Sequence, residues 1–247
     1  MSRIAIFAGT LGFWLCMAGI AGIILSPIGY RLGLWDFAFA IRDELKIATF
    51  AELAGVALIV VGLLFAKFGK TQIPIGRMLV GLIVGGVFAG YVVAQFSKVQ
   101  TLPYIHDITT DITNPPTFIA LAEQRKASPN GLDYMGAEIA DKQKQAYPDI
   151  VTMQSHLAPP ELFVIAEAAS RAAGWEIAGE DPQTGRIEAT ATSLIYGFKD
   201  DIVIRITPKA DGSLLDMRST SRVGLSDVGV NAKRIREFIA SLKSAGI

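Results

Sequence analysis

Cysteine, histidine and net charge are all scarce in this sequence of 247 residues. The single cysteine, Cys16, lies in an apolar stretch, so we expect no disulfide and no cysteine-based metal site in the rest of the chain. Lysine and arginine number 23, as do aspartate and glutamate, and the formal net charge is zero. This balance supplies no broad positive field for nucleic acid, so we expect no nucleic-acid partner.

Charged side chains are also scarce in three apolar stretches of the first hundred residues, at 4–25, 47–65 and 75–94. Each stretch is about long enough to cross a hydrocarbon core of ~30 Å as a helix. No small-x-small cleavage site follows the first one, so we interpret it as a retained helix and not a cleaved signal peptide. The sequence therefore predicts an integral membrane protein with the lipid bilayer as a partner.

The composition changes after Ser97, where charged residues and prolines become frequent. We expect a three-helix membrane anchor over residues 1–97, an extended tether over 98–116 and a soluble domain over 117–247. The last of these is large enough to bury a core of its own. Between the first two spans, residues 32–45 mix aromatic and charged side chains, which predicts an interfacial segment.

Basic residues predict the orientation. The short turn between the second and third spans contains Lys67, Lys70 and Arg77 without an acid, and Arg3 lies at the amino end. Positive charge in short loops is retained in the cytoplasm. The connection between the first and second spans also contains three basic residues, Arg31, Arg42 and Lys46. The closer spacing of the basic residues in the second connection decides the predicted orientation. We expect an inner (cell) membrane protein with a cytoplasmic N-terminus and a periplasmic C-terminal domain.

Two features of the spans have functional alternatives. Gly81 with Gly85, and Gly86 with Gly90, are small-xxx-small pairs that allow close helix packing, either within one chain, which we favour, or between the subunits of a homodimer. Glu52 is the one acid within a span, and an intramembrane carboxylate is a functional hypothesis by default. Its position, about one and a half turns from the start of the span, also allows hydration at the interface.

In the soluble domain, helical periodicity and turn residues predict helices at 117–124 and 137–146, after Pro159-Pro160, and from near Asp227 to the end. Alternating apolar residues predict strands at 149–154, 175–178, 186–193, 201–207 and 214–223. Two amphipathic helices flanking this meander predict a soluble α+β two-layer domain with an antiparallel sheet. The uncovered face is expected to be a solvated, charged face with a ladder across three strands: Glu188, Arg205 and Asp216.

Two segments, DMRSTSRVG at residues 216–224 and SDVGVNAKRI at 226–235, resemble the domain-of-unknown-function family numbered 1499. The resemblance extends to further segments, namely FKDD at 198–201, GRIEAT at 185–190, IHDI at 105–108, NPP at 114–116 and PIGYRLG at 27–33. It covers nearly the whole chain. The family has no established activity, so the resemblance supports the domain limits and implies no mechanism.

The segment around the last strand and final helix contains the residues expected to bind a ligand: Arg218, Ser219, Ser221, Arg222, Asp227 and Asn231. Arginines beside a helix N-terminus suit an anion such as a phosphate or carboxylate. In the alternative, which we favour, Asp227 caps the helix and the arginines pair with acids, so that the segment is structural.

His106, Asp107 and Asp111 are the cluster that most resembles an acid–base group or metal ligands, and His156 is the second histidine. Their spacing matches no zinc motif, and no Gly-x-Ser-x-Gly elbow is present. We therefore expect no metal and no cofactor. The first hypothesis is a non-catalytic envelope module that binds another envelope protein or an anionic ligand, with His106 and Asp107 among its ligand-binding residues. The rival is a membrane-tethered hydrolase or metal-dependent enzyme using His106, Asp107 and His156.

Overall fold

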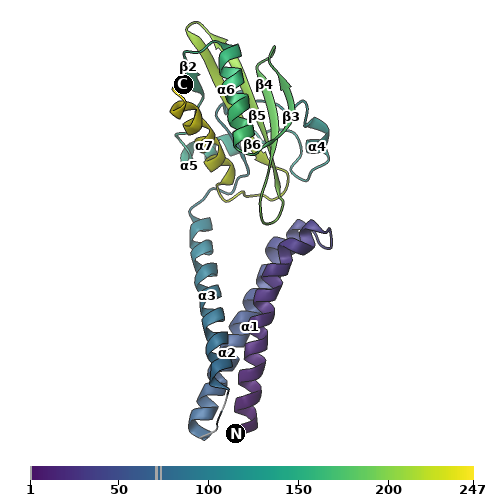
Figure 1. Cartoon of the computed structure of the whole chain (residues 1–247), viewed down its shortest axis with the longest axis vertical. Helices are drawn as coiled ribbons and strands as arrows, with labels where there is room; N and C mark the ends of the chain where they lie inside the picture. The colour runs from purple at the N-terminus through teal and green to yellow at the C-terminus, as the bar shows by residue number, and fades with distance from the viewer. Residues whose placement is uncertain (1, 70–71, 73) are drawn as a thin grey trace. The chain divides into compact units, whose positions relative to one another are not determined.

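The computed structural model describes residues 2–69, 72 and 74–247 (Figure 1). Lys70, on which the expected orientation partly rests, lies outside the described residues. The chain divides into two compact units, Met1–Gln100 and Thr101–Ile247. Each unit has its own set of elements and is described separately.

The first unit consists of three long helices, α1 (Ser2–Arg31), α2 (Glu44–Gly69) and α3 (Ile75–Gln100). All three are long and apolar enough to cross a membrane. The expected three-helix membrane region is therefore confirmed at the level of helix length and composition. The segment 32–45, expected to be interfacial, is partly helical, and its π-helix η1 (Phe39–Asp43) leads directly into α2.

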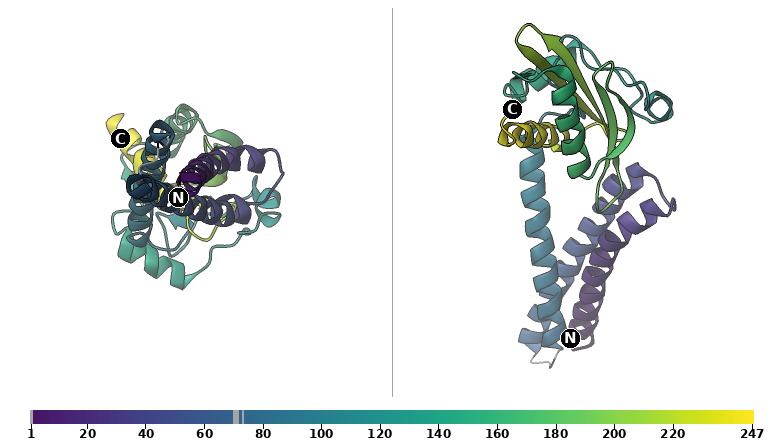
Figure 2. Two further views of the ribbon diagram at one scale, coloured as in Figure 1. Left: turned by 90° about the horizontal axis from the view of Figure 1, so that it is seen from below. Right: turned by 45° about the horizontal axis from the view of Figure 1, so that its top comes forward.

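Glycines allow close packing of the helices in this unit, where α1 and α2 lie side by side (Figure 2). A β-carbon on Gly12 would lie 2.5 Å from the Gly55 carbonyl oxygen, so the two backbones meet there. Gly81 and Gly85 are equally confined, with Ile59 and Val56 side-chain atoms 2.5 and 2.4 Å from the added β-carbons. These two glycines therefore contact side chains of α2 within the chain. Gly86 and Gly90 differ, because a β-carbon added to either would have no described atom within 4 Å.

The second unit is built on an antiparallel sheet in the order β1-β6-β5-β4-β3, with β2 also pairing β6. Its strands are β1 (Asp107–Thr109), β2 (Met153–Ser155), β3 (Glu176–Asp181), β4 (Arg186–Thr192), β5 (Lys199–Lys209) and β6 (Gly212–Ser221). Because β1 belongs to the sheet and residues 105–110 are buried, the tether expected over 98–116 is too long.

Two helices, α6 (Pro159–Ala172) and α7 (Val230–Ser244), cover one face of this sheet (Figure 1). Their apolar sides meet the inward side chains of the strands in one core, for example Leu162, Phe238, Ile204 and Met217. The shorter α5 (Ala137–Ala146) also contributes to this core. The predicted fold class, membrane helices followed by an α+β domain with an antiparallel sheet, is confirmed.

The other face of the sheet is not solvated, contrary to expectation. The segment between β1 and α5, including the short helix α4 (Ala122–Lys126), covers it, and Phe118 and Leu121 pack against Val203. The helix expected at 117–124 is thus reduced to α4. This irregular layer buries the polar side chains of three strands.

The expected ladder on that face is half right. Arg205 and Asp216 are register partners and form an ion pair at 2.8 Å. Glu188 lies opposite Val203, so it does not reach Arg205. Its carboxylate accepts hydrogen bonds from the Ile119 and Leu121 amides at 2.7 and 3.0 Å instead. Glu188 therefore fixes the covering segment to the sheet.

Candidate functional site

The residues expected to form one anion site lie on opposite faces of β6. Side chains alternate along a strand, so Arg218 and Arg222 point toward the covering segment, whereas Ser219 and Ser221 point toward α7. Their partners confirm this division, since Ser219 bonds Asn231 of α7 and Arg218 bonds carbonyls of the covering segment. The structure therefore resolves the expected site into two separate polar clusters.

On the face under the segment between β1 and α5, Arg218 donates two hydrogen bonds to the Asp107 carboxylate, at 2.9 and 2.7 Å. Both side chains are buried, and the guanidinium also donates to the carbonyls of Pro116 and Leu132 at 3.3 Å. The Phe118 ring centroid lies 5.2 Å from the guanidinium carbon. Every guanidinium nitrogen of Arg218 is thus engaged with the protein, which leaves none for an anion.

Asp201 joins two further arginines on the same face. Arg222 donates to its carboxylate at 2.9 and 2.8 Å, and Arg125 of α4 lies 3.4 Å away. Thr190 donates its hydroxyl to the same carboxylate at 2.8 Å. Burial lowers the pKa of Arg125, and the Asp201 carboxylate opposes that shift. Arg125 was not among the expected site residues, because it stands in a polar run that suggests an exposed helix.

On the α7 face, Asn231 connects three elements. Its amide oxygen accepts the Ser219 hydroxyl at 2.7 Å, and its amide nitrogen donates to the His106 carbonyl at 2.9 Å and to the Ser221 hydroxyl at 3.1 Å. Arg234, one turn later, pairs with Asp200 at 2.7 Å. The Ser219 and Ser221 hydroxyls, expected to bind a ligand, are therefore parts of a helix-to-sheet contact.

Asp227 accepts hydrogen bonds from the amides of Gly229 and Asn231 at 2.8 and 2.7 Å, although the N-cap position of α7 is Gly229 and not Asp227 as expected. The helix itself begins at Val230, after Gly229 in the left-handed region (φ 82°). Burial raises the pKa of the Asp227 carboxyl, and the two amides oppose that shift. An anion at this helix end would have to displace Asp227.

The histidines do not converge. His106 is buried, with its Nδ1 3.5 Å from the Thr220 hydroxyl, and this burial lowers its pKa. His156 is exposed. Its neighbour Ser155 pairs with Ser213 at the start of β6, whereas Asp107, the neighbour of His106, pairs with Thr220 near the end of that strand. These two positions on β6 are seven residues apart, about 23 Å along a strand. No group of three histidine, cysteine or acidic side chains among the described residues is placed to hold a metal.

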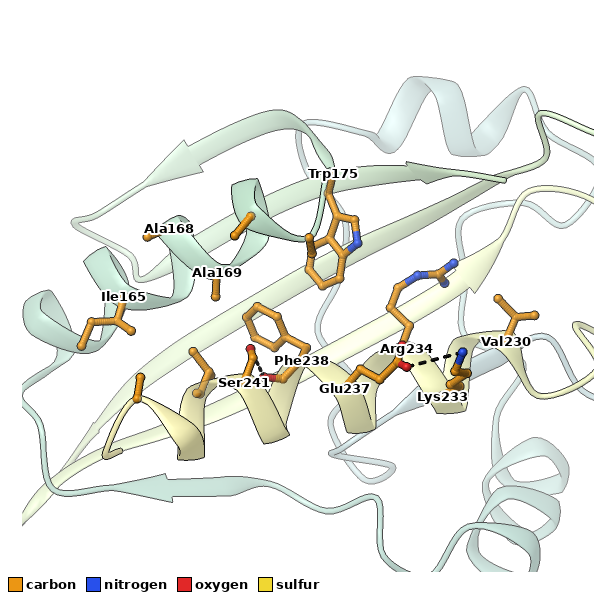
Figure 3. A pocket seen from close by; sticks show the side chains of 14 residues that line it. Ile165, Ala168, Ala169, Trp175, Val230, Lys233, Arg234, Glu237, Phe238 and Ser241 are labelled. Atoms are coloured by element: carbon orange, nitrogen blue, oxygen red, sulfur yellow. Dashed lines mark hydrogen bonds and ion pairs between the residues drawn. The ribbon is translucent and has the colours of Figure 1, made fainter. Parts of the chain in front are cut away.

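A groove lies between α6 and α7 (Figure 3). Its volume is about 810 Å³, and Ile165, Trp175 and Phe238 form its apolar centre. The rings of Trp175 and Phe238 pack with centroids 5.2 Å apart. The α6 wall and its extension consist of small side chains: Ala168, Ala169, Ala172 and Ala173. In the sequence this wall is visible only as a cluster of alanines within and just after the helix predicted to follow Pro159-Pro160.

Charge borders the groove on the α7 side. The Lys233 Nζ lies 3.4 Å from the Glu237 Oε1 (Figure 3), and both side chains are largely exposed. Arg234, the other cation of the lining, is bound to Asp200 and Ser219. The groove therefore combines an apolar centre with a rim that carries both signs of charge.

The soluble unit also matches a known family. The family model described as a protein of unknown function (DUF1499) covers residues 107–242, from β1 into α7, which is more than half of the chain. No curated protein matches this sequence. Since the match includes every strand of the sheet, all of α6 and most of α7, the chain belongs to the DUF1499 family, in which it combines the family's α+β domain with three candidate membrane-spanning helices.

Proposed function

We propose that this protein is a membrane-anchored binding module of the cell envelope, and that the groove between α6 and α7 receives an amphipathic helix of a partner protein. The observation that carries the proposal is the uncharged, exposed side of α6 that forms one groove wall. Ala168, Ala172 and Ala173 are exposed there. A helix on a protein surface normally turns charged or polar side chains toward water.

The shape of the groove favours a helix over a compact ligand. Methyl groups along α6 let a second backbone approach closely, and Trp175 and Phe238 offer an apolar floor between the two helices. Helix-in-groove recognition uses apolar anchors spaced three or four residues apart on one face of the partner. An apolar centre surrounded by a polar rim is also the usual organisation of a protein–protein interface.

The rim charges favour a protein over an anionic ligand. Lys233 and Glu237 present one charge of each sign, and the Arg234 guanidinium is already paired with Asp200. A partner helix with both acidic and basic residues complements such a rim, since complementary charges set specificity and register. The same pairing of Arg218 and Arg222 with aspartates argues against an anion at the originally expected residues.

The rival function, a hydrolase or metal-dependent enzyme, has less support. It needs His106 and Asp107 to meet a serine nucleophile or His156 in one pocket. Asp107 instead forms an ion pair with Arg218, and His156 lies near the opposite end of β6. We therefore place binding ahead of catalysis.

We further propose that the soluble domain lies in the periplasm and the N-terminus in the cytoplasm. Lys67 lies in the last turn of α2 and Arg77 in the first turn of α3, so the connection between these helices is basic on both sides. Alkaline phosphatase fused after Ile247 should be active, and a cytoplasm-dependent fluorescent fusion should be dark. The reverse pattern would place the domain in the cytoplasm.

Site-specific photo-crosslinking of the full chain in its own membrane tests the binding proposal. A photoreactive side chain at Ala168 or Ala172 should crosslink one partner segment at positions three or four residues apart. Val164 is the matched control, because it is an exposed apolar residue of α6 that does not line the groove. The same probe at Val164 should not yield that product.

A second substitution separates groove binding from chance proximity. Ala172→Glu adds a charge at an exposed helix position, so the free energy of unfolding should change by no more than about 0.5 kcal/mol. The crosslink from Ala168 should nevertheless disappear. Equal crosslinking from Val164, or a crosslink that survives Ala172→Glu, would overturn the proposed groove.

A further inference from the structure

Glu52 lies near the middle of the longest candidate span. That span runs from Phe39 to Gly69, so Glu52 has thirteen residues before it and seventeen after it. At 1.5 Å per residue, the carboxylate is about 20 Å along the helix from Phe39. The helix begins earlier than the apolar stretch does, so Glu52 lies farther from the start of the helix than the apolar stretch alone indicates.

The Glu52 carboxylate has no ion-pair partner among the described residues, and the only donor beside it is the Cys16 thiol, which is a weak one. The residue is only 2% exposed, and neither carboxylate oxygen accepts a hydrogen bond from a nitrogen or oxygen donor. Thr49, one turn earlier, donates its hydroxyl to the Leu45 carbonyl at 2.7 Å. The Cys16 thiol is the neighbouring polar group from α1, and it borders Gly85 as the carboxylate does. A buried ionised carboxylate is costly unless a cation or a proton compensates it.

The carboxylate opens onto a cavity between α2 and α3. This cavity measures about 310 Å³, and Glu52 is the one charged residue in its lining. Apolar side chains make up most of the walls, namely Leu53, Val56, Leu82, Phe88, Val92 and Val93. The volume falls in the range of small-molecule pockets, which commonly combine apolar walls with a few placed polar groups.

We propose that this cavity binds a lipophilic organic cation, with the charge paired to the Glu52 carboxylate and the apolar groups against α2 and α3. Such a ligand supplies both missing components, a positive charge for an unpartnered acid and apolar volume for an apolar cavity. Its ionic group must be poorly hydrated, since a strongly hydrated ammonium loses more on entering hydrocarbon. The site is separate from the α6–α7 groove, so either proposal can fail alone.

Binding of tetraphenylphosphonium to the purified full chain in lipid nanodiscs tests the proposal. We expect one saturable site per chain, measured by equilibrium dialysis against empty nanodiscs. Tetraphenylborate is the matched probe, because it has nearly the same shape and the opposite charge. It should show no saturable binding above that of empty nanodiscs.

Three variants locate the site. Glu52→Gln keeps the size of the side chain and should weaken tetraphenylphosphonium binding at least about tenfold, as loss of a buried charge partner does. Gly86→Leu should also abolish binding while it retains the acid, since Gly86 lines the cavity and has open space around it. Glu44→Gln is the control, because Glu44 lies on the same helix, faces Gly22 and does not line the cavity.

The outcomes separate binding from partitioning. Loss of binding in Glu52→Gln and Gly86→Leu, with Glu44→Gln unchanged, supports the site. Wild-type affinity in a folded Glu52→Gln variant, or equal binding of tetraphenylborate, would overturn it and leave Glu52 as a site for a proton alone. If Glu52→Gln does not fold, wild-type affinity in Gly86→Leu overturns the cavity in the same way.

Discussion

In the soluble domain Asp107 is buried against a guanidinium, whereas in the membrane unit Glu52 is buried with neither carboxylate oxygen bonded. The contrast holds for the other buried carboxylates of the soluble domain, each of which accepts from an arginine or from backbone amides: Glu188, Asp200, Asp201, Asp216 and Asp227. Burial alone therefore does not identify a functional group in this protein. What distinguishes Glu52 is burial without a cation or a strong hydrogen-bond donor among the described residues.

The difference has a physical cause in each unit. Moving an ion out of water costs several kcal/mol, and a soluble domain recovers this only with well-placed counter-charges and hydrogen bonds. The network on β6 meets that condition, so it stabilises one arrangement of sheet and cover. In the membrane unit the described residues around Glu52 offer no such compensation, which leaves a position that a ligand or a proton can occupy.

The largest expected effect is the loss of one member of a buried pair. Asp107→Ala leaves the Arg218 guanidinium buried and unpaired, and should lower the free energy of unfolding by about 3–5 kcal/mol. The melting temperature of the full chain in detergent should fall by roughly 10 °C. The double variant Asp107→Leu with Arg218→Met, which removes both charges, should recover much of this loss. A melting temperature unchanged in Asp107→Ala would show that the pair contributes nothing.

The membrane unit should respond with the opposite sign. Without added cation, Glu52→Gln removes an uncompensated carboxylate and should stabilise the full chain by about 2 kcal/mol, by analogy with the cost of inserting a charged side chain. Thermal unfolding in lipid nanodiscs measures this. Glu123→Gln is the control, since the Glu123 side chain is 84% exposed in the soluble domain. A destabilised Glu52→Gln variant would show that the carboxylate has a structural partner after all.

The regular elements were predictable because their signals are local. Apolar alternation between Gly185 and Tyr196-Gly197 predicted a strand at 186–193, and β4 spans Arg186–Thr192. The helix predicted at 137–146 is α5. Alternation also contained the information that Ser219 and Arg218 point to opposite faces, although the candidate site had grouped them.

The covering layer was not predictable in this way. Arg125 is buried because Asp201, 76 residues later, and the carbonyls at the end of β6 receive its guanidinium. Neither periodicity nor composition around α4 indicates such a partner. Glu188 likewise bonds the backbone amides of Ile119 and Leu121, which no side-chain pattern reveals. A polar segment becomes a buried layer through partners distant in sequence.

A smaller effect is expected at the start of α7. Asp227→Ala removes the acceptor for the Gly229 and Asn231 amides, and should cost about 0.5–2 kcal/mol, the usual range for a lost cap. Asp227→Asn retains one acceptor oxygen and should cost less. The comparison sharpens the contrast with Asp107, because Asp227 bonds amides and not a buried cation. A loss as large as that of Asp107→Ala would mean that Asp227 also compensates a charge.

The smallest effect at neutral pH is expected for His106, because its contribution appears only in acid. Burial lowers its folded-state pKa below the ordinary value of 6.5, and Arg125 acts in the same direction, while Asp107 and Asp227 oppose it. The unfolded chain therefore takes up a proton near pH 6.5 that the folded chain does not. Stability is complete above that pH and is lost as the pH falls below it, by at most about 1.4 kcal/mol per pH unit.

His106→Gln isolates this contribution. Unfolding should be followed from pH 7.5 to 5.5, and the difference between wild type and His106→Gln should change as the pH falls below 6.5, to the disadvantage of the wild type. His156→Gln is the control, since that side chain is exposed near the opposite end of β6. A wild-type pH profile in His106→Gln would mean that the buried ring takes up its proton equally in both states. The polar cluster beside β6 would then tolerate a further positive charge, which the pairing of its arginines with Asp107 and Asp201 argues against.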